Sequence, residues 1–191
     1  MPDATETPRL RISDRFADVT LINQFRQPVR FQREILNGRA VILNTMYTVC
    51  RGSCPGTSAK LMELRDELAP VFGRSLVMAS ISIDPLNDSP AALLDYAGGY
   101  GADRPREDRC DWHFLTGSAV DIDALRRSLG FFDLDPAVDR DPSRHAALLL
   151  FGNPRADRWA ALPSALRTPL LTEAIRRACG TTFEQRYGIP G

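Results

Sequence analysis

The chain lacks an excess of charge of either sign. Lysine and arginine together number 24, and aspartate and glutamate together also number 24, so the formal net charge at neutral pH is zero. Proteins that bind nucleic acid rely on a strong basic excess to neutralise phosphates. The composition therefore predicts a mixed-charge, solvated surface and no nucleic-acid partner.

Long apolar segments are also missing. No stretch approaches the roughly 20 apolar residues that are needed to cross a bilayer. The opening sequence, MPDATETPRLRISDRF, has neither the basic start nor the apolar middle of a signal peptide. We therefore expect the chain as given to be soluble, and any attachment to a membrane to go through an anchor that it does not contain.

Cysteine is scarce, with four residues at positions 50, 54, 110 and 179. This is too few for a disulfide-stapled scaffold in a chain of 191 residues, of which 43% are hydrophobic. A chain of this size and composition can bury a core without such staples. The clustered pair is therefore the feature to explain, since the other two cysteines are isolated in the sequence.

Strand and helix patterns alternate along the chain. Residues 40–46 form a short apolar run that is typical of a buried parallel strand. Residues 55–73 carry leucines at helical spacing behind Pro55, a residue suited to a first helical turn. The predicted elements are a hairpin at 19–31, strands at 40–46, 76–83, 112–117 and 145–151 with a return strand after 152, and helices at 55–73, 89–101, 118–130 and 168–180.

This alternation predicts an α/β fold in which helices flank both faces of a central sheet. We expect one domain at 19–180, a polar N-terminal arm at 1–18 and a C-terminal tail at 181–191. Ser89 and Thr168 are the predicted N-caps of two of the helices.

Cys50 and Cys54 follow a predicted strand and lie at the start of a predicted helix. The carboxyl ends of strands are where α/β folds build their sites. The partial positive charge of a helix N-terminus also stabilises a thiolate. A C-x-x-x-C pair in this place is consistent with a redox dithiol, a metal site or a stapled loop, and the residues alone leave these options open.

Four motifs, in order, resemble those of a known family. The loop MYTVCRGSCP looks like a C-x-x-x-C-P motif, SISIDPLNDSP resembles an S-x-D-P…D-T/S-P segment, WHFLTG is similar to an F-L-T-G stretch, and RHAALLLFGN carries a distant histidine. From about Asp18 to about Ile175, the chain resembles the Sco/SenC proteins, thioredoxin-like copper proteins of cytochrome c oxidase assembly.

The resemblance implies a thioredoxin-like fold with a mixed sheet, and a copper site made by Cys50, Cys54 and His145. Soft thiolates favour Cu(I), and imidazole suits both copper states. The implied function is a metallochaperone that delivers copper to a respiratory cytochrome c oxidase or matures its copper site. The implied partner is an oxidase subunit or another copper chaperone, and the implied location is periplasmic or membrane-associated.

The alternative function is a thiol–disulfide oxidoreductase that uses Cys50 and Cys54 as a redox dithiol to keep target-protein cysteines reduced. Against it, such enzymes favour C-x-x-C spacing and do not need His145. A peroxidase of the peroxiredoxin type is disfavoured because Tyr47 stands where those enzymes want a threonine. A domain that has kept the fold and lost the metal is the remaining option.

Other polar residues carry weaker expectations. His113 is expected to be structural or exposed. Asp84 and Asp88 are expected to serve turn and cap chemistry, with a role beside the cysteines as the less favoured hypothesis. Cys110 and Cys179 are expected to be buried or idle thiols, and the sequence leaves open whether they pair.

Overall fold

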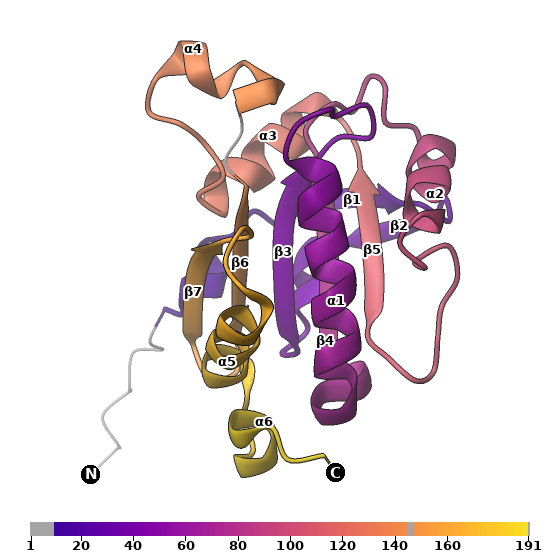
Figure 1. The fold of residues 1–191 in the computed structure, drawn as a ribbon. Coiled ribbons are helices and arrows are strands. Elements are labelled where there is room, and N and C mark those ends of the chain that lie inside the picture. The colour runs from indigo at the N-terminus through magenta and orange to yellow at the C-terminus, as the bar shows by residue number, and fades with distance from the viewer. Residues whose placement is uncertain (1–9, 145–146, 191) are drawn as a thin grey trace, which may run out of the picture.

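The computed structural model describes residues 10–144 and 147–190, and these build one seven-stranded sheet flanked by helices (Figure 1). The strand order is β2-β1-β5-β4-β3-β6-β7. The strands are β1 (Thr20–Asn23), β2 (Pro28–Arg30), β3 (Ala40–Met46), β4 (Leu76–Ser82), β5 (Asp111–Thr116), β6 (Leu148–Asn153) and β7 (Arg158–Pro163). Strands β3, β4 and β5 are parallel to one another, and the remaining pairs are antiparallel. The predicted mixed sheet and thioredoxin-like fold are confirmed.

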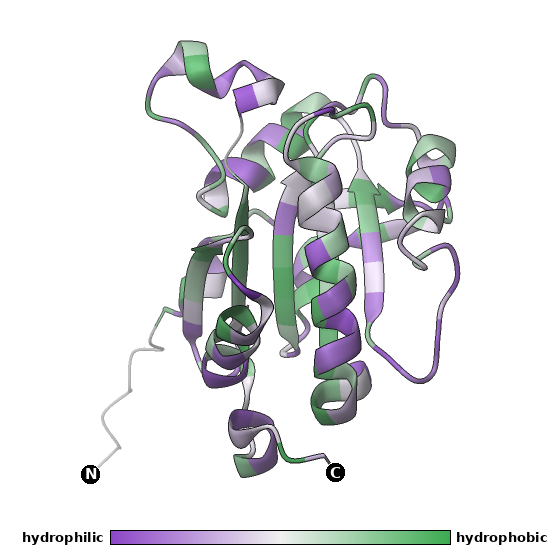
Figure 2. Ribbon diagram, in the orientation of Figure 1, coloured by the Kyte–Doolittle hydropathy of each residue, from purple (hydrophilic) through white to green (hydrophobic). Residues whose placement is uncertain are grey.

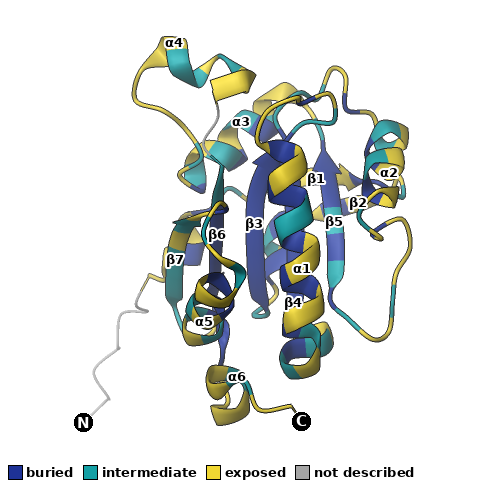
Figure 3. Ribbon diagram, in the orientation of Figure 1, coloured by how far each residue is buried: buried dark blue, intermediate teal, exposed yellow. Residues whose placement is uncertain are grey.

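The two central strands are buried along their whole length. Every residue of β3 and β4 is buried, and the strands pair in parallel from Ala40 opposite Leu76 to Met46 opposite Ser82. Figure 3 shows β3 in dark blue. Strands covered on both faces need continuous apolar sequence, which is why this region of the sequence reads as apolar runs rather than as an alternating pattern.

Helices cover both faces of the sheet. Helices α1 (Cys54–Phe72), α2 (Pro90–Gly98) and α5 (Thr168–Cys179) pack on the face that Met46 and Phe114 share. Helix α3 (Ala119–Ser128) and the π-helical segment η2 (Phe31–Leu36) pack on the opposite face. Figure 2 shows β3 and β6 mostly green between these polar-faced helices. The shorter elements are η1 (Ile12–Arg15), η3 (Gly73–Ser75), α4 (Pro136–Asp139), η4 (Pro142–Arg144) and α6 (Phe183–Tyr187).

Most predicted elements are found with shifted ends. The hairpin forms from β1 and β2, and the Ser89 side chain caps α2 by accepting the N–H of Ala92. The strand predicted at 145–151 begins only at Leu148. Residues 145–146 lie outside the described part of the chain.

The prediction of Thr168 as an N-cap is wrong. Helix α5 begins at Thr168, and its cap position is Arg167, whose side chain makes no capping bond. The Thr168 hydroxyl instead accepts a hydrogen bond from Lys60 and donates one to Glu63, both on α1. A contact with a neighbouring helix has replaced the local cap.

The segments before and after the predicted domain contact its body. Phe16 is buried and packs edge-on against Trp159, and the Gln32 amide donates to the carbonyls of Ser13 and Phe16. Helix α6 lies within the predicted tail, at the end of the molecule opposite the cysteine loop (Figure 1). Within the described residues, no helix is both long and apolar enough to cross a membrane.

Candidate metal and redox site

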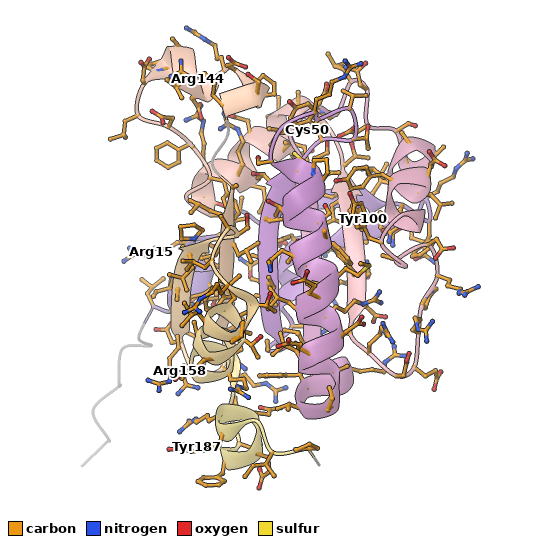
Figure 4. All side chains as sticks on the ribbon, viewed as in Figure 1. Arg15, Cys50, Tyr100, Arg144, Arg158 and Tyr187 are labelled. Atoms are coloured by element: carbon orange, nitrogen blue, oxygen red, sulfur yellow. The ribbon has the colours of Figure 1, made fainter. Side chains whose placement is uncertain are left out.

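Cys50 and Cys54 lie at the carboxyl end of β3, as predicted. Strand β3 ends at Met46, a loop follows, and α1 begins with Cys54 itself. The N–H of Cys50 donates to the carbonyl of Tyr47 at 3.2 Å, which makes a turn of residues 47–50. Pro55 occupies the first turn of α1, where its missing N–H costs nothing. Figure 4 shows Cys50 above the N-terminal end of α1.

The two thiols are in contact with each other. Their side chains share a hydrogen bond, and both cysteines are in the reduced thiol form. The N–H of Gly52 donates to Cys50 Sγ at 3.4 Å. Cys50 keeps 8% of its surface exposed and Cys54 keeps 1%. Cys50 is therefore the thiol that a reagent or partner meets first.

The surroundings of the two sulfurs separate their acidities. Burial acts to raise the pKa of Cys50, but hydrogen bonds outweigh it and leave that pKa below its ordinary value. The donors include the Cys54 side chain and the backbone N–H groups of Cys54 and Gly52. Burial, followed by the bond with Cys50, raises the pKa of Cys54 to about 12. Cys50 is thus the thiol that ionises, and Cys54 stays protonated and stabilises it.

Tyr47 is a site residue whose role the sequence did not reveal. A hydrogen bond with Cys50, followed by burial, raises the pKa of Tyr47 to about 12. The phenol therefore stays protonated and can donate a hydrogen bond to the Cys50 sulfur. From the sequence, Tyr47 indicated only that the protein is not a peroxidase of the peroxiredoxin type. Its position three residues before the cysteine was the available signal.

Asp88 also contacts the cysteine loop, across 40 residues of sequence. Its carboxylate is fully buried and accepts hydrogen bonds from the backbone and hydroxyl of Thr48, two residues before Cys50. Asp84, by contrast, accepts from the Asn87 side chain within its own turn. The expected turn chemistry is thus found at Asp84, while Asp88 reaches beyond its turn.

The loop after α3 reaches the same edge of the sheet. Its anchor is Asp139, whose side chain is 4% exposed and pairs with Arg126 at 2.6 Å and Arg127 at 2.5 Å. The hydrogen bond from Arg126 holds the pKa of Asp139 well below its usual range. A cavity of about 260 Å³ separates this loop from the sheet, with Thr45 at the end of β3 and Phe131 on the loop among its lining residues.

His145, the third predicted ligand, lies outside the described residues. The described residues nearest to it in sequence, Arg144 and Ala147, belong to the end of η4 and to the approach to β6. Strand β6 runs antiparallel to β3, so it begins at the edge where β3 ends. Figure 4 shows Arg144 and Cys50 at the same end of the molecule.

The donor set that the structure describes is the dithiol alone. Within residues 10–144 and 147–190, no group of three or more histidine, cysteine, aspartate or glutamate side chains is placed to hold a metal ion. Two adjacent thiols are nevertheless what soft metal ions such as Cu(I) prefer. The residues present therefore fit a soft ion, and they equally fit dithiol–disulfide chemistry.

The remaining histidine and cysteines lie apart from this site. His113 is half-buried on β5, and burial lowers its pKa. Cys110 and Cys179 are buried free thiols, and burial raises their pKa values to about 11 and about 12. The Cys179 thiol donates to the carbonyl of Gly152 at 3.4 Å. These observations agree with the expected structural roles.

Comparison with known proteins gives the family. The SCO1/SenC family model matches residues 6–179 of the 191. The chain belongs to the SCO1/SenC family. A search of curated protein sequences finds no significant match.

Solved structures of Sco proteins share the fold of this SCO1/SenC member. Arabidopsis thaliana ScoI with copper bound aligns with a TM-score of 0.65 and 22% identity, covering 84% of this chain and 94% of that one. Bradyrhizobium japonicum ScoI with copper bound gives 0.66 and 19%, covering 85% and 98%. Yeast Sco1 with copper bound gives 0.64 and 20%, covering 90% and 93%.

Proposed function

We propose that this SCO1/SenC protein binds one copper ion through Cys50, Cys54 and His145. It then delivers the copper to the copper-receiving subunit of a respiratory cytochrome c oxidase, directly or through another copper chaperone. The observation that carries the proposal is the pair of thiols in hydrogen-bond contact at the end of β3. A site with two soft donors already adjacent needs little rearrangement to take a soft ion.

The relatives support this function at the level of the family. Three Sco structures carry bound copper, from a plant, a bacterium and yeast. A further relative, BsSco, is described as a member of a family of cytochrome c oxidase assembly proteins. A relative from Bacillus anthracis is described as a lipoprotein, which supports a periplasmic or membrane-associated location for this chain.

The two cysteines would take unequal parts in metal capture. Thiol ligands bind metal as thiolates, so metal binding releases protons. Cys50 has the lowered pKa and offers the first sulfur. Cys54, with a pKa of about 12, gives up its proton as the metal arrives. Copper affinity should therefore rise with pH across the neutral range.

A copper titration of the reduced protein tests the proposal. We expect one Cu(I) per chain under anaerobic conditions, measured against a chromophoric competitor, and one Cu(II) with a sulfur-to-copper charge-transfer band. Cys50→Ser and Cys54→Ser should each lose the tight site. Cys110→Ala, which changes a thiol remote from the loop, is the matched control and should bind like the parent. Unchanged binding in both site variants would contradict the proposal.

The second candidate function is thiol–disulfide exchange. The unequal acidities of Cys50 and Cys54 favour it, because a low-pKa attacking thiol beside a protonated resolving thiol is what such exchange uses. Reduction of a disulfide-bonded oxidase peptide by copper-free protein tests this function separately. The two activities can share one dithiol.

A further inference from the structure

Asp88 is a carboxylate with no access to water. Its exposed fraction is 0%, and none of the ion pairs among the described residues includes it. Burying such a group is costly unless hydrogen bonds replace the lost water. Three donors do so. The Thr48 N–H lies 3.1 Å from Oδ1, the Thr48 hydroxyl donates to the same oxygen, and the Ser82 hydroxyl lies 2.6 Å from Oδ2.

These bonds join the turn of Cys50 to the segment around Asp88, which lies 40 residues later in the sequence. Thr48 belongs to the turn that carries Cys50, and Ser82 is the last residue of β4. Asp88 itself directly precedes the cap of α2, and its N–H donates to the carbonyl of Asp84 at 2.9 Å. The carboxylate therefore ties the Cys50 turn to the rigid end of the sheet.

Cys54 has a different anchor. It is the first residue of α1 and is 1% exposed. The separation of the two sulfurs consequently depends on the start of α1 for Cys54 and on the Asp88–Thr48 contact for the turn that carries Cys50, besides the hydrogen bond between Cys54 and the Tyr47 backbone. Loss of the Asp88–Thr48 contact would leave Cys54 at the start of α1 and loosen the turn that holds Cys50.

We propose that Asp88 is a positioning residue for the dithiol, which acts through Thr48 to hold Cys50 Sγ within reach of Cys54 Sγ. The expected effect of Asp88 on copper binding rests on the proposed function, whereas its expected effect on disulfide formation does not. Holding two reacting groups together lowers the entropy cost of joining them. Asp88 thereby favours the disulfide over the dithiol, and it pre-forms the pair of sulfurs for a metal ion.

The test measures the equilibrium of copper-free protein with glutathione. Oxidation by glutathione disulfide joins the two sulfurs, and the two electrons and two protons released reduce that disulfide to two glutathione thiols. Trypsin separates the site cysteines into residues 40–51 and 52–60. The oxidised form therefore appears as one linked pair of peptides, and the reduced form as two alkylated peptides.

Thr48→Val removes the hydroxyl donor and keeps the branched shape, and Asp88→Asn keeps the shape and removes the charge. Both should lower the equilibrium constant for disulfide formation at least about fivefold, equivalent to about 20 mV in potential. Thr48→Ser restores the hydroxyl and should return to within about twofold of the parent, because the bond to a charged acceptor is regained.

Ser89→Ala is the matched control. It removes the cap of α2 next to Asp88 and so destabilises the fold without touching the Cys50 turn. Its equilibrium constant should equal that of the parent. Parental constants in both Thr48→Val and Asp88→Asn would overturn the proposal. An equal shift in Ser89→Ala would also overturn it, since the effect would then be general destabilisation.

The copper titration of the same variants keeps the two proposals apart. If the parent protein bound no copper, the proposed function would fail while the glutathione result could still stand. If the parent bound copper and the constants did not move, the role of Asp88 would fail alone.

Discussion

Limited alkylation of the reduced, copper-free protein should label Cys50 far faster than Cys54. The pKa of Cys54 is raised from 9.0 to about 12, whereas hydrogen bonds leave that of Cys50 below 9.0. The two values therefore differ by at least about three units, so the thiolate fraction at neutral pH is at least ~1,000-fold larger at Cys50.

The rate ratio is smaller than the ratio of thiolate fractions. A thiolate with a lower pKa is a weaker nucleophile, with a Brønsted coefficient of about 0.4–0.5, which offsets about 20- to 30-fold over three units. A net preference of at least about 30-fold for Cys50 remains. The difference in exposure, 8% against 1%, acts in the same direction.

The sequence makes this measurement simple. Trypsin cuts after Arg51, so Cys50 and Cys54 fall in separate peptides, and Cys110 and Cys179 fall in two others. A brief pulse of light iodoacetamide, unfolding, and a chase of heavy reagent give all four rates from one digest. Equal labelling of the two site cysteines, or faster labelling of Cys54, would refute the assignment of Cys50 as the reactive thiol.

Mild oxidation of the metal-free protein should join Cys50 and Cys54 in a disulfide that dithiothreitol reverses, and thiol counts that stay unchanged would contradict this. Leu64→Ala should lower the free energy of unfolding by about 2–5 kcal/mol in urea titration, because the side chain is fully buried. Asp139→Asn should speed tryptic cleavage within residues 140–144, since it removes the ionic anchor of that loop. The pKa of Asp139 is lower in the folded protein than in the unfolded chain. Its contribution to stability is therefore fully present above the unfolded value of about 3.9 and is lost as the pH falls through the folded pKa. If Asp139→Asn and the parent lost stability in the same way as the pH was lowered, this role of Asp139 would be contradicted.

The central fold could be predicted because its signals are local. The apolar run at 40–46 and the helix behind Pro55 depend only on neighbouring residues, and both appear with ends shifted by at most one residue. The position of Cys50 and Cys54 between them follows directly. The order of motifs then gave the family.

The missed features depend on distant partners. Asp88 was predicted chiefly to stabilise its own turn, because Thr48 is 40 residues away and no periodicity signals that contact. Thr168 was predicted to be a helix N-cap, because its actual partners, Lys60 and Glu63, lie on another helix. Tyr47 is the exception, because its contact with Cys50 is local and its position three residues before that cysteine was the available signal.

The most direct test of the account is a copper titration of His145→Ala beside the parent. The variant keeps both thiols, so exchange with a disulfide-bonded peptide should persist. It lacks the imidazole, so Cu(II) affinity should fall at least about tenfold, while Cu(I) affinity should fall less because two thiolates satisfy a soft ion. If His145→Ala bound both copper states like the parent, the three-ligand site would be contradicted, and the dithiol-reductase function would become the better account.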